Sequence, residues 1–229
     1  MSSFLCKLSY LALTLAIFSA EAKVAGHLIY SKGSVSFGKT GGKYTRLKRK
    51  SSFREGDLIK TGPSSLAILK LLDGSKIKLS ANSNIKIRRL KNRSGTKDTS
   101  IYIRYGSAFF NILKSKRKKP HFTVRSRLIS MGVRGTTFFA RVQKRNSQDS
   151  ISMCVQKGSV LVQNVKRKKP VLVRAGLGVK IKNGISIPKP QAFPWIKKLN
   201  WNFNPRKTLH AGQNPNKLYS QDLLGIDYD

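Results

Sequence analysis

Apolar and polar residues alternate along most of the chain between residues 27 and 187. Lys78 stands between Ile77 and Leu79, and Tyr102 stands between Ile101 and Ile103. A period of two residues is typical of half-buried β-strands. Turn-forming pairs separate these runs, among them Gly41-Gly42, Asp73-Gly74 and Asn183-Gly184. The pattern predicts an all-β fold, an antiparallel β-sandwich with short turns and little helix.

A short glycine-serine motif recurs at the start of three predicted strands. Its three copies are Gly33-Ser34-Val35, Gly106-Ser107-Ala108 and Gly158-Ser159-Val160. Their spacing is irregular, so they do not mark a solenoid repeat. We interpret each glycine as the residue that permits a tight turn into a strand.

The first 22 residues have the pattern of a secretory signal peptide. Lys7 precedes an apolar run from Leu8 to Phe18, and small residues follow at Ala20 and Ala22. The run is too short to span a bilayer, and the alternative is a buried helix of the folded domain. We expect an exported protein of the periplasm or cell surface, without a transmembrane anchor in the mature chain.

The charge of the chain is strongly unbalanced. It contains 46 Lys and Arg against nine Asp and Glu, a formal net charge of +37. Such a charge attracts polyanions but says little about the fold. For an exported protein the polyanion would be an anionic envelope polymer, a lipid surface or extracellular DNA; a basic proteome is the plain alternative. Cys154 is the only cysteine after the predicted signal, so we expect no disulfide and an inert thiol.

Two basic runs stand between predicted strands, each just before a proline. They are candidate polyanion-binding residues, and in a sandwich they could converge on one end; the alternative is solvated loop charge with no dedicated partner. The residues are Lys114, Lys116, Arg117, Lys118 and Lys119 in the first run, and Lys166, Arg167, Lys168 and Lys169 in the second.

The composition changes near residue 188, where proline and asparagine become frequent. Trp195, Trp201 and Phe203 are interpreted as anchors that pack an extended tail onto the domain. The chain ends in an acidic segment, residues 222–229. We therefore divide the chain into a signal peptide (1–22), a β domain (23–187) and an extended Pro- and Asn-rich tail (188–229).

Several short motifs follow one another in a set order over residues 33–160. They are a G-x-V strand, G-[DE]-x-[IL]-x-T-G, a D-G-S hairpin, F-x-V, V-R-G-T-x-F and a final G-x-V. In this order the chain resembles the FecR-like domain family of bacterial envelope proteins. The motif residues are Gly33, Val35, Gly56, Asp57, Thr61, Gly62, Asp73, Gly74, Ser75, Gly106, Phe122, Val124, Arg134, Gly135, Thr136, Phe138, Gly158 and Val160.

The resemblance implies a jelly-roll-like β-sandwich and carries no active site. We interpret the motif residues as structural, with Gly62 and Gly74 at turn positions of positive φ, Gly135 at a close approach of two backbones, and Arg134 bridging to Asp57 or Glu55. The best-known relatives relay signals across a membrane, whereas this chain has no internal membrane helix. The Thr-Pro usual after F-x-V is replaced by Ser126-Arg127.

No pattern in the sequence indicates catalysis. His27, His121 and His210 lack metal-ligand spacing, and no nucleophile elbow, Walker loop or dinucleotide fingerprint is present. We expect no enzyme, no metal and no cofactor. The leading hypothesis is an envelope-binding or scaffolding module for an anionic or glycan polymer, peptidoglycan, or another envelope protein. The alternative is a periplasmic sensory component of a FecR-type signalling system. A weaker one is a secreted nucleic-acid binder with Tyr102, Tyr105 and Phe109 as stacking residues; otherwise nucleic acid would bind only non-specifically.

Overall fold

The computed structural model describes residues 22–93, 96–114, 122–145, 148–165, 169–182 and 186–204. About 60% of the described residues are strand and 3% are helix. The prediction of an all-β fold is confirmed. The predicted signal peptide and the acidic C-terminal segment lie outside the described residues, apart from Ala22.

The strands form two layers that share one long strand. Layer A runs in the order β4 (Ser52–Arg54), β1 (Val24–Lys32), β6 (Leu66–Leu71), β7 (Lys76–Leu79), β9 (Thr96–Asn111), β12 (Thr137–Arg145), β13 (Gln148–Lys157) and β16 (Gly178–Lys182). Layer B runs in the order β3 (Tyr44–Arg46), β2 (Val35–Gly38), β5 (Leu58–Thr61), β8 (Asn84–Arg93), β9, β10 (Phe122–Arg125), β11 (Ile129–Val133), β14 (Ser159–Asn164) and β15 (Val171–Arg174).

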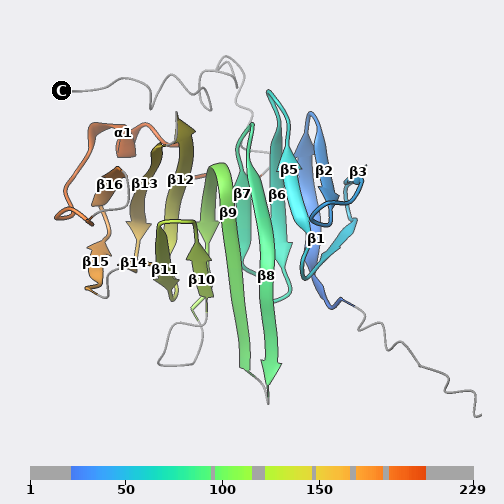
Figure 1. The fold of residues 1–229 in the computed structure, drawn as a ribbon, viewed down its shortest axis with the longest axis horizontal. Helices are drawn as coiled ribbons and strands as arrows, with labels where there is room; N and C mark the ends of the chain where they lie inside the picture. Colours follow the sequence, from blue (N-terminus) through green and yellow to red (C-terminus); the bar gives the residue numbers. More distant parts are fainter. Residues whose placement is uncertain are drawn as a thin grey trace, which may run out of the picture.

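Strand β9 also divides the molecule along the sequence. Strands β1–β8 lie on one side of it in both layers, and strands β10–β16 lie on the other side. Figure 1 shows this division by colour, with blue and cyan strands on one side of the green β9 and olive to orange strands on the other. The shared strand is therefore the seam between the two halves of the chain.

The bend that lets β9 serve both layers lies at Gly106. Residues before it pair with β8 and β10 in layer B, and residues from Gly106 onward pair with β12 and β7 in layer A. Its φ of +90° is a conformation that residues with a side chain rarely adopt. A Cβ atom here would lie 2.4 Å from the Cα of Ser83. Only glycine fits this corner without strain.

The three glycine-serine motifs all mark points at which the chain passes from one layer to the other. Gly33 separates β1 from β2, Gly106 divides β9, and Gly158 separates β13 from β14. A hydroxyl from a neighbouring connection bonds the backbone at each motif. Ser65 Oγ accepts from the Ser34 amide at 2.8 Å, Ser83 Oγ accepts from the Ser107 amide at 2.9 Å, and Thr136 Oγ1 donates to the Ser159 carbonyl at 2.9 Å. The motif thus builds a hydrogen-bonded corner between layers.

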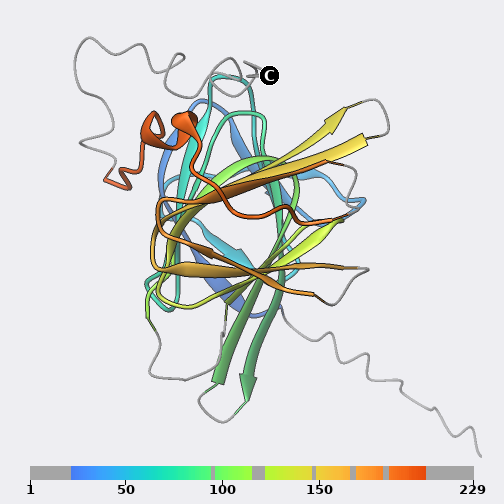
Figure 2. The same ribbon diagram turned by 90° about the vertical axis from the view of Figure 1, so that its left-hand side faces the viewer.

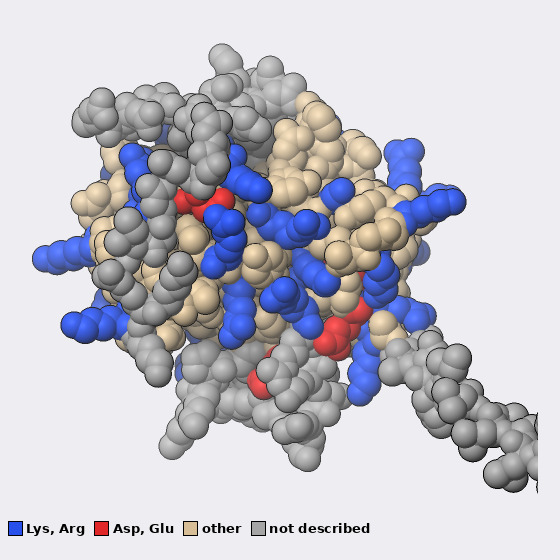
Figure 3. Space-filling model, viewed as in Figure 1, with Lys and Arg blue, Asp and Glu red and all other residues tan. Residues whose placement is uncertain are grey.

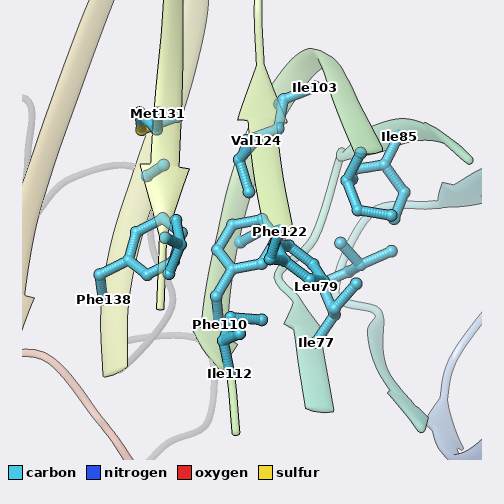
Figure 4. Close-up of a cluster of buried hydrophobic side chains, with 14 of the residues drawn as sticks. Ile77, Leu79, Ile85, Ile103, Phe110, Ile112, Phe122, Val124, Met131 and Phe138 are labelled. Atoms are coloured by element: carbon cyan, nitrogen blue, oxygen red, sulfur yellow. The ribbon is translucent and has the colours of Figure 1, made fainter. Parts of the chain in front are cut away.

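The main hydrophobic core fills the space between the layers. It takes the inward-facing residue of each alternating pair, such as Ile77 and Leu79 of β7 and Ile101 and Ile103 of β9. Figure 4 shows Phe110, Phe122 and Phe138 at its centre. The rings of Phe110 and Phe138 stack with their centroids 4.7 Å apart. This core is what the period-two pattern predicts.

Two details differ from the sequence predictions. Strand β10 pairs with β9 in parallel, with Phe122 opposite Thr99, so the sandwich is mixed rather than wholly antiparallel. The parallel pairing follows because β9 ends in layer A and β10 returns to layer B through the connection 112–121, which replaces a tight hairpin. The prediction of a positive φ at Gly62 is wrong, since in this turn it is Ser64 that has one.

Candidate functional site

A C-terminal strap, residues 191–204, covers the outer face of layer A. It begins where Gln191 pairs with Gly178 through two backbone hydrogen bonds of 2.8 and 3.0 Å. A single helical turn follows, α1 (Pro194–Lys197). Figure 2 shows this orange segment on the outside of the sandwich. Although it holds little regular structure, the strap is fixed to the domain.

Aromatic side chains hold the strap in place. Trp195 and Phe203 are buried against Phe109, Phe139 and Cys154, which point outward from β9, β12 and β13. Phe109 lies 4.8 Å from Phe139 and 5.5 Å from Trp201, measured between ring centroids. Burying one aromatic side chain stabilises a fold by about 1.5–3 kcal/mol. This second cluster, which we call the strap cluster, therefore makes a substantial contribution to stability.

Lys78 lies beneath the strap and is wholly buried. Its Nζ donates hydrogen bonds to the backbone carbonyl oxygens of Asn200 and, at 2.8 Å, of Asn202. The same nitrogen lies 4.3 Å from the centroid of the Phe109 ring. The lysine side chain therefore binds the backbone of the strap, and the aromatic rings around it exclude water from this contact.

Burial shifts the protonation of this lysine. Removal from water lowers the pKa of Lys78 from 10.5 to about 7. The outer-face positions of β6, β7, β12 and the layer A half of β9 carry no Asp or Glu that would favour the charged form. Docking of the strap over Lys78 therefore favours the neutral form of this lysine.

Cys154 lies under the same strap and is fully buried. Burial raises the pKa of its thiol, although a hydrogen bond with the backbone at Phe139 acts in the opposite direction. Because the thiolate is the reactive form, this environment suppresses nucleophilic chemistry.

We expect Cys154 to resist a thiol-specific disulfide reagent at pH 8 in the native chain. A Cys6→Ser variant leaves Cys154 as the only thiol and makes the readout unambiguous. Labelling should become rapid in denaturant, and faster than native in a chain ending at residue 187, because the strap shields the sulfur. Native labelling at the denatured rate would show that the strap does not shield it.

The motif residues at turns make contacts within the fold. Asp73 accepts a hydrogen bond from the Ser75 amide at 2.9 Å, and Ser75 Oγ accepts one from the Leu113 amide at 3.1 Å. Thr61 Oγ1 donates to the Ser80 carbonyl at 2.6 Å. Asp57 forms an ion pair with Lys39 at 2.7 Å and accepts from the Arg54 amide. These side chains stabilise turns and connections at the ends of the strands.

Other motif residues lie in the core or at corners. Val35, Phe122, Val124, Phe138 and Val160 are buried between the layers. Gly135 has a φ of +62°, and a Cβ atom there would lie 2.9 Å from the Cβ of Lys114 and 3.2 Å from its Cα. Gly33, Gly56, Gly74, Gly106 and Gly158 have positive φ as well. Arg134 and Thr136 flank Gly135 in the connection from β11 to β12.

The residues that replace the family's Thr-Pro build a local turn. Ser126 Oγ accepts from the Leu128 and Ile129 amides at 3.3 and 3.2 Å. Arg127 forms an ion pair with Asp149 at 2.7 Å, and the aspartate is nearly buried. Ser126 and Arg127 therefore stabilise this turn through polar side-chain contacts.

The structure places the flanks of the two basic runs apart. Lys114 and Lys169 are exposed, whereas Lys116–Lys119 and Lys166–Lys168 lie outside the described residues. Phe122 follows the first run. It lies opposite Val133 of β11, which in turn lies opposite Val160 at the start of β14. The second run follows Asn164, at the other end of β14. The runs therefore join layer B at opposite ends of its strands, which gives their expected convergence no support.

The described part of the chain holds neither a helix that could span a membrane nor a cluster of metal-ligating side chains. No helix there is long and apolar enough to cross a bilayer. No three His, Cys, Asp or Glu side chains within that part gather into a possible metal site. Phe109 is buried in the strap cluster on layer A, so it does not join Tyr102 in a base-stacking surface, as the nucleic-acid hypothesis supposed.

Comparison with protein families decides the classification. Residues 57–161 match the family model described as FecR protein. The chain carries a FecR domain. The resemblance found in the sequence motifs is confirmed. The strands on either side of the match, including β1–β4 and β15–β16, extend the same two layers beyond the matched FecR residues.

Solved structures and curated sequences add little to this FecR assignment. Two crystal structures of a protein from Parabacteroides distasonis ATCC 8503, described as a putative anti-sigma factor, are 19% identical to the chain with TM-scores of 0.49 and 0.48. Each match covers 62% of this chain, and 62% and 63% of those chains, respectively. No curated protein matches the sequence.

The sequence predictions missed the role of Lys78. Alternation placed it on the outer face of β7 but gave no reason to expect burial. The signal was present in the double phenylalanines Phe109-Phe110 and Phe138-Phe139, because a strand that is apolar on both faces must be covered on both. Together with the tail aromatics, these pairs indicate a covered outer face.

Proposed function

We propose that the chain is a non-enzymatic, exported component of a FecR-type envelope signalling system, acting in the periplasm or at the cell surface. The FecR match over residues 57–161 carries this proposal. The role requires contact with a partner protein rather than chemistry. This proposal favours the sensory alternative over the scaffolding hypothesis that led the sequence analysis.

Deletion of the gene in its native host tests the signalling role. We expect a small, defined set of transcripts to change and to be restored by the wild-type chain. A photo-crosslinking amino acid at exposed Tyr105 or Leu113 should capture a membrane partner. A chain with the crosslinker in place of buried Phe110 is the matched control. Unchanged transcripts together with retention of the protein on purified sacculi would contradict signalling and favour scaffolding.

Polymer scaffolding remains the second candidate function. The net charge of +37 favours it, because so basic an exported protein will meet anionic polymers of the envelope. A FecR domain could serve both roles if one surface binds a polymer and another contacts a partner. Experiments can separate the two functions. Binding of a polymer should weaken as the salt concentration rises, whereas signalling should change the level of specific transcripts.

A further inference from the structure

The outer face of layer B is a strongly basic surface. The residues that point away from the core on its strands include seven cationic side chains: Arg46, Lys60, Lys86, Arg88, Arg104, Arg125 and Arg174. We call these seven residues the basic face. Among the outward positions of this layer whose side chains the structure describes, Asp98 is the one acid. Figure 3 shows a side of the molecule on which Lys and Arg clearly outnumber Asp and Glu.

The strand register spaces these cations regularly. Arg46 and Lys60 flank Ser36 on three neighbouring strands, and Lys86 and Arg125 flank Tyr102 on three others. Neighbouring strands lie about 4.8 Å apart, so each pair is separated by about 10 Å across the sheet. A linear polymer that crosses the strands would meet positive charge repeatedly along its path.

Two tyrosines hold cations on this face instead of offering open rings. Lys60 Nζ lies 3.9 Å from the centroid of the Tyr44 ring, and the guanidinium carbon of Arg88 lies 4.6 Å from that of Tyr102. Proteins that bind single-stranded nucleic acid stack bases on free aromatic rings. At Tyr44 and Tyr102 a cation already lies over the ring, which favours a ligand recognised by charge.

Nothing described covers this face. The C-terminal strap lies on layer A, and the strap cluster contains no residue of β5, β8 or β10. Exposed apolar side chains on layer B are few, and Leu161 and Leu172 form a pair far from Lys60 at the β14–β15 edge. The cations extend from β3 to β15, well beyond that pair, so the surface suits a polymer better than a lipid bilayer.

We propose that the basic face binds a linear polyanion of phosphate groups that lacks aromatic bases. The charge complementarity of the face carries this proposal, which does not depend on the signalling role. The proposal places the candidate polyanion contact on the strands of layer B, whereas the sequence placed it on the two loop runs.

The test compares two variants of equal net charge. The face variant carries Lys60→Gln, Lys86→Gln, Arg104→Gln and Arg125→Gln. The control carries Lys32→Gln, Lys70→Gln, Lys157→Gln and Lys182→Gln, which lie on layer A strands. Binding to long-chain inorganic polyphosphate is measured over a salt series, with thermal unfolding checked for both. Parallel arms use single-stranded DNA of equal charge and phosphatidylglycerol vesicles.

We expect the face variant to lose about 10- to 100-fold in polyphosphate affinity at physiological salt, and its salt slope to fall by about three to four. The control should lose much less. Equal losses would overturn the proposal, because binding would follow total charge. Preference for DNA that depends on Tyr105, or binding to vesicles alone, would overturn it as well. If the face variant does not fold, the pair Lys86→Gln and Arg125→Gln against Lys70→Gln and Lys182→Gln gives the same comparison.

Discussion

Gly106→Ala is expected to destabilise the domain by about 2–5 kcal/mol. The added Cβ would lie 2.4 Å from the Ser83 Cα at a φ of +90°. Positive φ costs a residue with a side chain about 1–3 kcal/mol, and overpacking costs a similar amount. Both penalties fall on the one strand that the two layers share.

Gly176→Ala is the matched control for this substitution. Its φ is +82°, but no heavy atom lies within 4 Å of the position that the added methyl group would take. It should therefore carry only the conformational cost of about 1–3 kcal/mol. Thermal unfolding followed by circular dichroism measures both variants, and the Gly106 variant should melt about 5–15 °C below the wild type. Equal melting temperatures for the two variants would show that the corner relaxes around the methyl group.

The strap should become more stable as pH rises from 6 to 9, by about 2–3 kcal/mol. Lys78 has a pKa of about 7 when buried and 10.5 when exposed, so the unfolded or released state binds more protons. The contribution of Lys78 to strap stability is complete above pH 10.5, where the lysine is neutral in both states. It is lost as the pH falls through about 7. Below that pH the docked lysine is charged, and no further loss is expected.

Tryptophan fluorescence measures this effect directly, because the only two tryptophans of the chain, Trp195 and Trp201, both belong to the strap. Urea unfolding at a series of pH values should show the predicted rise in wild type. Lys78→Met should remove most of it, and Lys76→Met, which loses the same charge at a less buried neighbour on β7, should keep it. The same pH dependence in both variants would assign the effect to general charge repulsion.

The sequence predicted the two layers of this fold better than it predicted the strap contact and the basic face. Alternation is a local property, so Ile77, Leu79, Ile101 and Ile103 could be assigned to a core without any knowledge of their partners. The position of Lys78 depends on residues more than 120 positions away, at Asn200 and Asn202. No local period carries that information.

The basic face escaped prediction for a related reason. Lys60, Lys86 and Arg125 are single cations within alternating strands, where each resembles an ordinary solvent-facing residue. The runs 114–119 and 166–169 drew attention because their charges are adjacent in sequence. The register of the strands places these isolated cations on one face of layer B. The residues that flank the two runs lie at opposite ends of that layer.

The position of β9 also bears on the order in which the domain can assemble. Strands β1–β8 precede it in the chain, so β7 and β8 present open edges until β9 emerges and pairs with both. Unpaired strand edges invite association with other chains. A nascent chain that ends before β9 would therefore expose both edges to other chains, and the pairing of this single strand covers both.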